Sequence, residues 1–317
     1  MSFTLHAPAK INWFLFILGK RQDGYHDISS LMQCVSLYDT LSFEEWDGLD
    51  VVMESPDIEG VRNPTLEENL VYRAAVLLRE ETGTKKGARI TLTKEIPLSA
   101  GLGGGSSDAV QTLIGLDRLW GLNLGKGKLG ELALRLGSDT LFFLDGPAAL
   151  IEGRGERVAP VEMEKSYPIV LLNPGFGVST KWAYSQGAPC PDIGGARSPA
   201  ELTKKPNDIK LLIRAVRTGD FSLLRSRGYE PLRFSGGNDF TVPVTGRYPV
   251  LRQFKERLRE NGALYAEMSG SGPTVFGVFK DAEGAEAVRK AVIAEGFVTP
   301  ISEGFVTPWA RVVETLV

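Results

Sequence analysis

Short runs of apolar and β-branched residues dominate the first 54 positions of the chain. Turn residues at Gly19, Asp23-Gly24 and Asp47-Gly48 separate these runs, which is the pattern of consecutive strands. The longest apolar run, at positions 11–18, is too short to span a bilayer and carries no signal-peptide cleavage region. We therefore expect a buried strand there and no membrane segment.

Helical periodicity begins after this strand-rich part. Positions 70–82 place apolar residues on one helix face, with Asn69 as the N-cap. A strand at 88–94 then leads into a glycine-rich loop, and further helices are expected at 106–120 and 129–136. The order strand, loop, helix is the one that a phosphate site at a helix N-terminus requires.

The pattern restarts beyond a loop-rich stretch near residue 160, so we expect two domains, 1–160 and 161–317. Strands and helices alternate in the second domain, which indicates an α+β fold with an antiparallel sheet.

Residues 187–206 are rich in Pro, Gly and Lys and have no period, and we predict a surface loop. Positions 293–300 are followed by a near-copy at 301–308, a local duplication rather than a repeat architecture. The strands are expected at 168–173, 264–268, 274–279 and 310–314, and the helices at 208–217, 248–261 and 282–294.

Composition narrows the function classes. The chain has 317 residues, is 43% hydrophobic and 24% charged, and has a formal net charge of −3. This charge balance argues against binding to nucleic acid or to an anionic membrane. Cys34 and Cys190 stand in no Cys-x-x-Cys cluster, so we expect free thiols in a reducing cytoplasm. With His6 and His26 as the only histidines, a His-based metal site is not expected.

The most informative stretch is 97–109, Pro-Leu-Ser-Ala-Gly-Leu-Gly-Gly-Gly-Ser-Ser-Asp-Ala, directly ahead of the second predicted helix. Glycines let main-chain N–H groups approach a ligand, and the helix start adds unpaired donors and a positive dipole end. Together they predict a phosphate cradle. The stretch lacks the third glycine of the dinucleotide fingerprint, and no Gly-Lys pair of the chain is followed by the Ser or Thr of a P-loop. The protein-kinase signatures are absent as well.

Three separated segments resemble the motifs of the GHMP kinase superfamily. They are 7–13 (Ala-Pro-Ala-Lys-Ile-Asn-Trp), the glycine-rich loop as Pro-x-x-x-Gly-Leu-Gly-x-x-Ser-Ser, and 268–276 (Met-Ser-Gly-Ser-Gly-Pro-Thr-Val-Phe). Within the superfamily, Gly-Lys-Arg-Gln-Asp-Gly-Tyr-His at 19–26 resembles the 4-diphosphocytidyl-2-C-methyl-D-erythritol kinases. The resemblance implies an α+β, two-domain GHMP kinase fold. Its N-terminal domain is like ribosomal S5 domain 2, and its C-terminal domain is ferredoxin-like.

The resemblance also implies a reaction: transfer of the ATP γ-phosphoryl to the 2-hydroxyl of the cytidyl substrate. Asp139 is then the base and Lys10 its electrostatic partner. The residues alone leave Asp139 open as a helix cap and Lys10 open as a strand-end lysine that reaches water. Thr140-Leu141 stand where the family usually has Val-Pro. The missing proline predicts a less pre-organised backbone at Asp139.

Further site residues follow from the same resemblance. Asn12, Tyr25, His26 and Tyr184 map onto the substrate pocket, with Trp182 competing for the role of Tyr184. Ser106 or Ser107 is expected to reach a phosphate or the Mg²⁺ that the nucleotide carries. The residues assigned to ATP are Asn69, Lys94, Pro97, Leu98, Ser99, Ala100, Gly101, Leu102, Gly103, Gly104, Gly105, Ser106, Ser107 and Asp108.

Other functions remain compatible with parts of this pattern. The same fold and chemistry serve mevalonate, homoserine or a sugar in related kinases, although the Tyr25-His26 segment argues for the cytidyl compound. A non-catalytic nucleotide-binding member would be expected to lack Lys10 or Asp139, and both are present. A dinucleotide-binding oxidoreductase is the most distant alternative.

Overall fold

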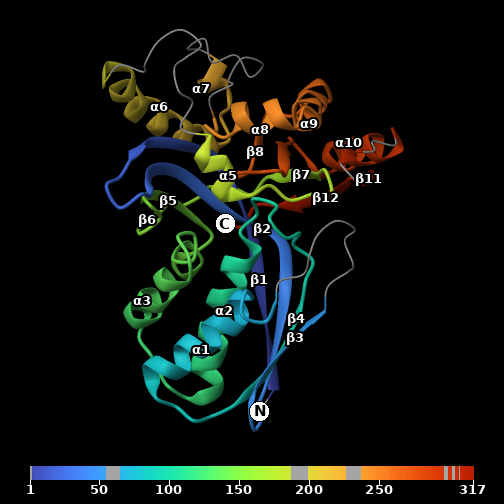
Figure 1. The fold of residues 1–317 in the computed structure, drawn as a ribbon. Coiled ribbons are helices and arrows are strands. Elements are labelled where there is room, and N and C mark those ends of the chain that lie inside the picture. The colour runs from blue at the N-terminus through green and yellow to red at the C-terminus, as the bar shows by residue number, and fades with distance from the viewer. Residues whose placement is uncertain are drawn as a thin grey trace.

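The computed structural model describes residues 2–54, 65–186, 199–225, 237–295, 299–301, 304–306 and 308–317. Two sheets organise this part of the chain, one in each half of Figure 1, and helices pack on both. Mixed helices and antiparallel strands confirm the α+β prediction. The boundary at residue 160 stays a prediction.

The first sheet has six strands in the order β3-β4-β2-β5-β6, with β1 paired to β2. Its two long strands form an antiparallel hairpin whose turn contains Asp23-Gly24, as the sequence predicts. The pairing register of β1 shifts at Pro8/Ala9 and again at Asn12/Phe14. Such shifts bend a strand and re-aim its side chains, and they flank the segment that carries Lys10. The strands are β1 (Ser2–Lys20), β2 (His26–Glu44), β3 (Leu49–Glu54), β4 (Ala88–Thr93), β5 (Ala148–Gly153) and β6 (Arg157–Pro160).

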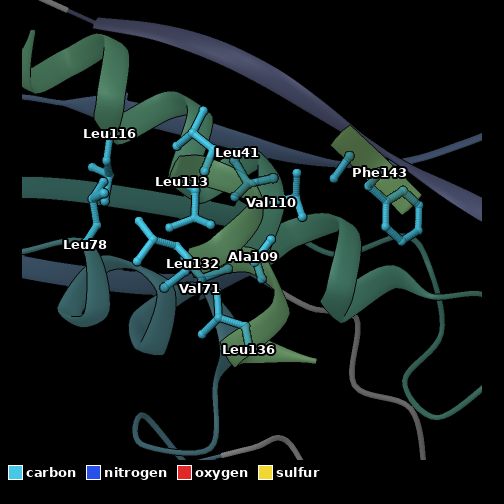
Figure 2. Close-up of a cluster of buried hydrophobic side chains, with 14 of the residues drawn as sticks. Leu41, Val71, Leu78, Ala109, Val110, Leu113, Leu116, Leu132, Leu136 and Phe143 are labelled. Atoms are coloured by element: carbon cyan, nitrogen blue, oxygen red, sulfur yellow. The ribbon is translucent and has the colours of Figure 1, made fainter. Parts of the chain in front are cut away.

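Helices α1 (Leu70–Thr82), α2 (Gly104–Trp120) and α3 (Lys126–Leu136) pack together against this sheet. Figure 2 shows Leu78, Leu113 and Leu132, one from each helix, meeting in the same buried cluster. The apolar helix faces read from the sequence therefore form the core. A short helix, α4 (Phe142–Asp145), follows α3.

The second sheet has four antiparallel strands in the order β12-β7-β9-β8, as predicted for this half. The core of this half continues across β1, because Trp13 packs edge-on against Tyr167 and Phe276. The strands are β7 (Pro168–Asn173), β8 (Tyr265–Met268), β9 (Val275–Val278) and β12 (Trp309–Glu314). The helices are α5 (Thr180–Ser185), α6 (Pro199–Thr218), α7 (Ser222–Arg225), α8 (Thr241–Arg247), α9 (Val250–Glu260) and α10 (Ala282–Ala294).

Two predictions of local structure need correction. The helix expected at 208–217 begins at Pro199, so part of the loop predicted at 187–206 is helical, while 187–198 lie outside the described residues. The helix expected at 106–120 begins at Gly104, inside the glycine-rich loop. The duplicated segments contribute β10 (Thr299–Ile301) and β11 (Gly304–Val306), which pair with each other as a hairpin.

Candidate active site

A cavity of about 1300 Å³ opens where the two halves of the structure meet. Its lining comes from β1 and β2, from the glycine-rich loop, from Gly270-Ser271, from the turn before α4, and from α5 with the segment before it. The cavity therefore contacts each of the three segments that the sequence analysis singled out.

These three segments meet around Lys10. The Lys10 backbone N–H donates to the Leu102 carbonyl at 2.8 Å, and the Lys10 Nζ donates to the Gly101 carbonyl at 2.9 Å. A Cβ on Gly103 would lie 2.9 Å from Lys10 Cγ, and one on Gly270 would lie 3.2 Å from Lys10 Nζ. Both positions have positive φ. Glycine is therefore required there so that two backbone turns can approach one lysine.

The turn at 269–272 supports the glycine-rich loop directly. Ser269 Oγ donates to the Gly101 carbonyl at 2.9 Å, and a Cβ on Gly101 would lie 2.2 Å from the Ser269 carbonyl oxygen. Asn238 holds this turn in place, since its Nδ2 donates to the carbonyls of Met268 and Gly270 at 2.8 and 2.7 Å. The glycine-rich loop thus rests on a second turn from the other half of the chain.

Lys10 and Asp139 form an ion pair in the lining of the cavity. The Lys10 Nζ lies 3.7 Å from Asp139 Oδ2, with the lysine side chain 3% exposed and the aspartate 34% exposed. The Nζ also donates to Asn12 Oδ1 at 2.5 Å. Burial lowers the pKa of Lys10, and the charge of Asp139 opposes that shift. The lysine does not reach water as a strand-end residue would, so the structure favours the electrostatic reading of Lys10.

Thr140 fixes the turn that carries Asp139. Its buried hydroxyl lies 2.5 Å from the Ala133 carbonyl and 2.6 Å from the Gly137 carbonyl, and it shares one proton between them. A bond to the last turn of α3 restricts this backbone as the usual proline would through its fixed φ. The expectation of a looser backbone at Asp139 is therefore not supported. The sequence reading noted Thr140-Leu141 only as a departure from the usual Val-Pro and did not find these two hydrogen bonds.

The glycine-rich loop lines the cavity through the start of α2. Gly103, Gly104, Gly105 and Ser106 all border it, and their N–H groups belong to the unpaired donors of a helix N-terminus. Ser107 is fully buried, so Ser106 is the one of these two serines that lines the cavity. Pro97, Leu98, Ser99, Ala100, Gly101 and Lys94 line the cavity as well.

Four residues assigned to ATP lie beside the cavity rather than in its lining. They are Asn69, Leu102, Ser107 and Asp108. Asn69 caps α1, where its Oδ1 accepts from the Val71 N–H at 2.9 Å. A cap of this kind accounts for the side chain without a nucleotide. Contacts between these four residues and ATP stay predictions. All four are buried, which also fits a role in supporting the fold around the cavity.

A buried triad lies beneath the loop. Lys94 Nζ is bonded to Asp39 Oδ2 and lies 2.8 Å from Asp108 Oδ2. Asp39 Oδ1 also accepts the N–H groups of Glu95 and Ile96, at 2.7 and 2.9 Å. Asp39 thereby fixes the backbone that leads into the phosphate loop. Sequence reasoning missed Asp39 because it lies in β2, far from any motif.

Asp108→Asn tests the charge balance of this triad. Burial raises the pKa of Asp108 to about 7, with the nearby Asp39 carboxylate acting in the same direction against Lys94. A carboxyl with a raised folded pKa stabilises the fold at low pH, and its contribution is lost as the pH rises toward that value. The quantity to follow is the Tm of the variant minus the Tm of the natural chain. We expect this difference to increase by about 2–4 °C as the pH is raised from about 5 to about 8. Thermal unfolding across that range measures it.

The exposed Asp50→Asn is the matched control for this experiment, because the Asp50 side chain is 41% exposed. Asp50 lies outside the buried triad, so its replacement should not reproduce the pH-dependent Tm difference expected for Asp108→Asn. A Tm difference for Asp108→Asn that stays constant over the whole range would contradict the raised pKa of Asp108.

The predicted substrate residues gather at one end of the cavity. His26 stacks on Tyr184 with ring centroids 5.1 Å apart, and Tyr184 meets Phe240 edge-on at 4.8 Å. Tyr25 lines the same end and is 51% exposed. Trp182 instead packs against Tyr248. Tyr184 is therefore the better candidate for a stacking ring.

His26 faces this end as a neutral imidazole at neutral pH. Burial lowers its pKa, and the charge of Lys20 lowers it further. A neutral imidazole has one donor and one acceptor nitrogen, which suits the edge of a nucleobase. Asn12 also lines the cavity but lies beside Lys10 rather than in this aromatic group, and its Nδ2 donates to Ser30 Oγ at 2.8 Å.

The chain matches two domain families. Residues 69–151 match the GHMP kinases N-terminal domain, and residues 212–298 match the GHMP kinases C-terminal domain. Among the helices in the described part of the chain, none combines the length and the apolar character needed to cross a bilayer.

Curated relatives and solved structures agree with these matches. A 4-diphosphocytidyl-2-C-methyl-D-erythritol kinase of Thermodesulfovibrio yellowstonii is 40% identical over 99% of this chain and 98% of its own. The enzyme of the same name from Pelotomaculum thermopropionicum is 40% identical over 91% and 93%. A crystal structure of a 4-(cytidine 5'-diphospho)-2C-methyl-D-erythritol kinase has a TM-score of 0.70 and 32% identity, covering 98% of this chain and 99% of that one. A homoserine kinase from Cytophaga hutchinsonii shares the fold, with a TM-score of 0.72, 20% identity and coverage of 100% and 95%.

Proposed function

The chain belongs to the 4-diphosphocytidyl-2-C-methyl-D-erythritol kinases, a branch of the GHMP kinases, and from this we propose how its own residues carry out the reaction. The γ-phosphoryl of ATP passes to the 2-hydroxyl of the cytidyl substrate in the non-mevalonate route to isoprenoid precursors. The observation that carries the proposal is the Lys10–Asp139 pair, 3.7 Å apart, set between a phosphate loop and an aromatic pocket.

Asp139 is the proposed base. As the substrate oxygen forms its bond to the γ-phosphorus, the bond from that phosphorus to the β-phosphate oxygen breaks and ADP leaves. The proton of the hydroxyl goes to a carboxylate oxygen of Asp139. With its side chain 34% exposed, Asp139 is open to the cavity on the side where the substrate would lie.

Lys10 is the proposed electrostatic partner. Its ammonium keeps Asp139 ionised and stabilises the charge that develops on the transferred group. Because the Asn12 and Gly101 oxygens also hold the Nζ, the charge is positioned before the substrate arrives. Such pre-organisation costs no reorganisation during the reaction.

The start of α2 is the proposed phosphate site, with Ser106 as the hydroxyl that faces it. Among the described residues, no three His, Cys, Asp or Glu side chains gather as a metal site. The Ser106 hydroxyl, which lines the cavity, fits an Mg²⁺ carried by the nucleotide, because such an ion takes few protein ligands. When bound, the ion would neutralise charge on the phosphates.

The aromatic end of the cavity supports a cytidyl acceptor over a small aliphatic one. Tyr25, His26 and Tyr184 offer ring faces and polar edges that mevalonate or homoserine would leave unused. A kinase of this family is not a dinucleotide-dependent oxidoreductase. The presence of both Lys10 and Asp139 at 3.7 Å supports catalysis rather than nucleotide binding alone.

Release of ADP with different acceptors tests the proposal. The cytidyl compound is expected to give a kcat/KM at least about 10⁴ times that for mevalonate or homoserine, because a site built for polar contacts rejects molecules that lack them. Equal turnover with all three acceptors, or no turnover above the ATP-only background, would refute the proposed substrate.

We also place this reaction in the cytoplasm. The described part of the chain contains one cysteine, Cys34, which is a free and buried thiol. Burial raises the pKa of Cys34 to about 12. The thiol therefore stays protonated and unreactive, and a reducing compartment with ATP suits it.

A further inference from the structure

We propose that Arg154, with Lys20 and Lys181 beside it, recognises the diphosphate of the cytidyl substrate and positions the acceptor hydroxyl at Asp139. The proposal rests on the proposed function and adds the residues that read the charge of the substrate. Arg154 and Lys181 lie outside the motifs of the sequence analysis, and Lys20 belongs to the segment 19–26 but was given no role there.

Each of these cations is paired with one aromatic ring of the substrate end. Arg154 Cζ lies 5.1 Å from the centroid of the Tyr25 ring. Lys20 is the cross-strand partner of His26 in the β1–β2 hairpin, and its charge acts on that ring. Lys181 precedes Tyr184 by one turn of α5, so both lie on the same helix face. All six side chains line the cavity.

The turn that carries Arg154 is built against the turn that carries the base. A Cβ on Gly155 would lie 2.2 Å from the Ser138 carbonyl oxygen, and Gly155 has a φ of 126°. The Arg154 N–H donates to Glu156 Oε2 at 2.6 Å. Glycine at 155 therefore allows the β5–β6 turn to rest on the residue before Asp139. A diphosphate held by Arg154 would be fixed relative to the catalytic carboxylate.

The other cations that line the cavity have partners that occupy them. Lys10 is held by Asn12, Gly101 and Asp139, and Lys94 lies between two buried carboxylates. The charge of Arg154 also acts on Asp23, whose carboxylate has other partners. One oxygen of Asp23 accepts the Tyr25 N–H at 3.1 Å, and the other lies 3.1 Å from Arg21 Nε.

An aromatic ring beside a solvent-accessible cation suits a ligand with both a base and an anionic tail. The ring offers a stacking face, and the cation offers a charge-assisted hydrogen bond to a phosphate oxygen. A planar guanidinium makes that bond in a bidentate way. A nucleoside diphosphate satisfies both parts, and a nucleoside satisfies only the first. The local cations also explain how a chain of net charge −3 attracts an anionic substrate.

Arg154→Gln tests the proposal with two competing ligands, cytidine diphosphate and cytidine. In the natural chain the diphosphate should bind more tightly than the nucleoside, by calorimetry without ATP. In the variant we expect the ratio of the two dissociation constants to fall about tenfold, the scale of one hydrogen bond to a charged group. The KM of the cytidyl substrate should rise by a similar factor, while the KM of ATP stays within about twofold.

Two further variants sharpen the result. Arg154→Lys keeps a charge and should restore part of the ratio. Arg157→Gln changes an exposed arginine of β6 that does not line the cavity, and it should change neither ligand's affinity.

The proposal would be overturned if the ratio of the two dissociation constants were unchanged in Arg154→Gln. If the ratio were unchanged because both ligands lost affinity equally, Arg154 would be assigned to the stacking of Tyr25 instead. Failure of the wild-type chain to phosphorylate the cytidyl compound would instead count against the proposed function. In that case a lower ratio of the two dissociation constants in Arg154→Gln would still assign Arg154 to binding of the diphosphate.

Discussion

Asp139→Asn is expected to lower kcat by about 10³-fold, within the range that general bases contribute. An amide oxygen does not take the proton of the acceptor hydroxyl at neutral pH. The substitution also removes the negative charge 3.7 Å from Lys10 Nζ, which leaves a buried ammonium with neutral partners. The KM values should change far less than kcat, because Asp139 acts on the reacting oxygen. Steady-state ADP release with saturating cytidyl substrate measures the loss.

Asp145→Asn is the matched control for this variant. Asp145 ends α4, a few residues beyond Asp139, and pairs with Lys126 at 2.5 Å on the surface. Its replacement should leave kcat within about twofold. If Asp139→Asn kept a full kcat while folding normally, Asp139 would not be the base.

Lys10→Ala is expected to lower kcat by about 10²–10³-fold, the scale of losing one pre-organised donor to a developing charge. The KM of ATP should rise by less than about fivefold. The reason is geometric: Lys10 Nζ lies against Asp139 and the Gly101 carbonyl. The N–H groups at the start of α2 are left to bind the phosphates. Initial rates over a range of ATP concentrations separate the two parameters.

Lys10→Met separates charge from packing. Its side chain has nearly the same length, so it keeps the contact with the glycine turn at Gly103. Its kcat should fall as far as that of Lys10→Ala. A variant pair with normal kcat and a strongly raised KM for ATP would make Lys10 a binding residue only.

The sequence predicts much of the scaffold because local signals are strong there. Asn69 caps α1 as read from its capping chemistry, and α1 ends at Thr82 as expected. The apolar faces of α2 and α3 form the core in Figure 2. The segment around Lys10, the glycine-rich loop and the turn at 269–272 come together in space as the motif resemblance implies.

Other parts of the site depend on contacts between distant residues and leave no local pattern. Thr140 acts through carbonyls of the preceding helix. Asp39 acts on backbone N–H groups of residues 95 and 96, far along the chain. The choice between Ser106 and Ser107 depends on which face of α2 turns to the cavity. Such contacts between residues far apart in the chain cannot be predicted from composition or from motif spacing.

Identification of the product tests the central claim most directly. The natural chain is incubated with ATP and the cytidyl compound, and the product is followed by phosphorus NMR. The account predicts one new phosphomonoester resonance, from a phosphoryl group on the oxygen of the tertiary carbon. The two diphosphate resonances of the cytidyl group are retained, and the amount of ADP formed equals the amount of this product. Formation of ADP with only inorganic phosphate, or a phosphoryl group at another hydroxyl, would contradict it.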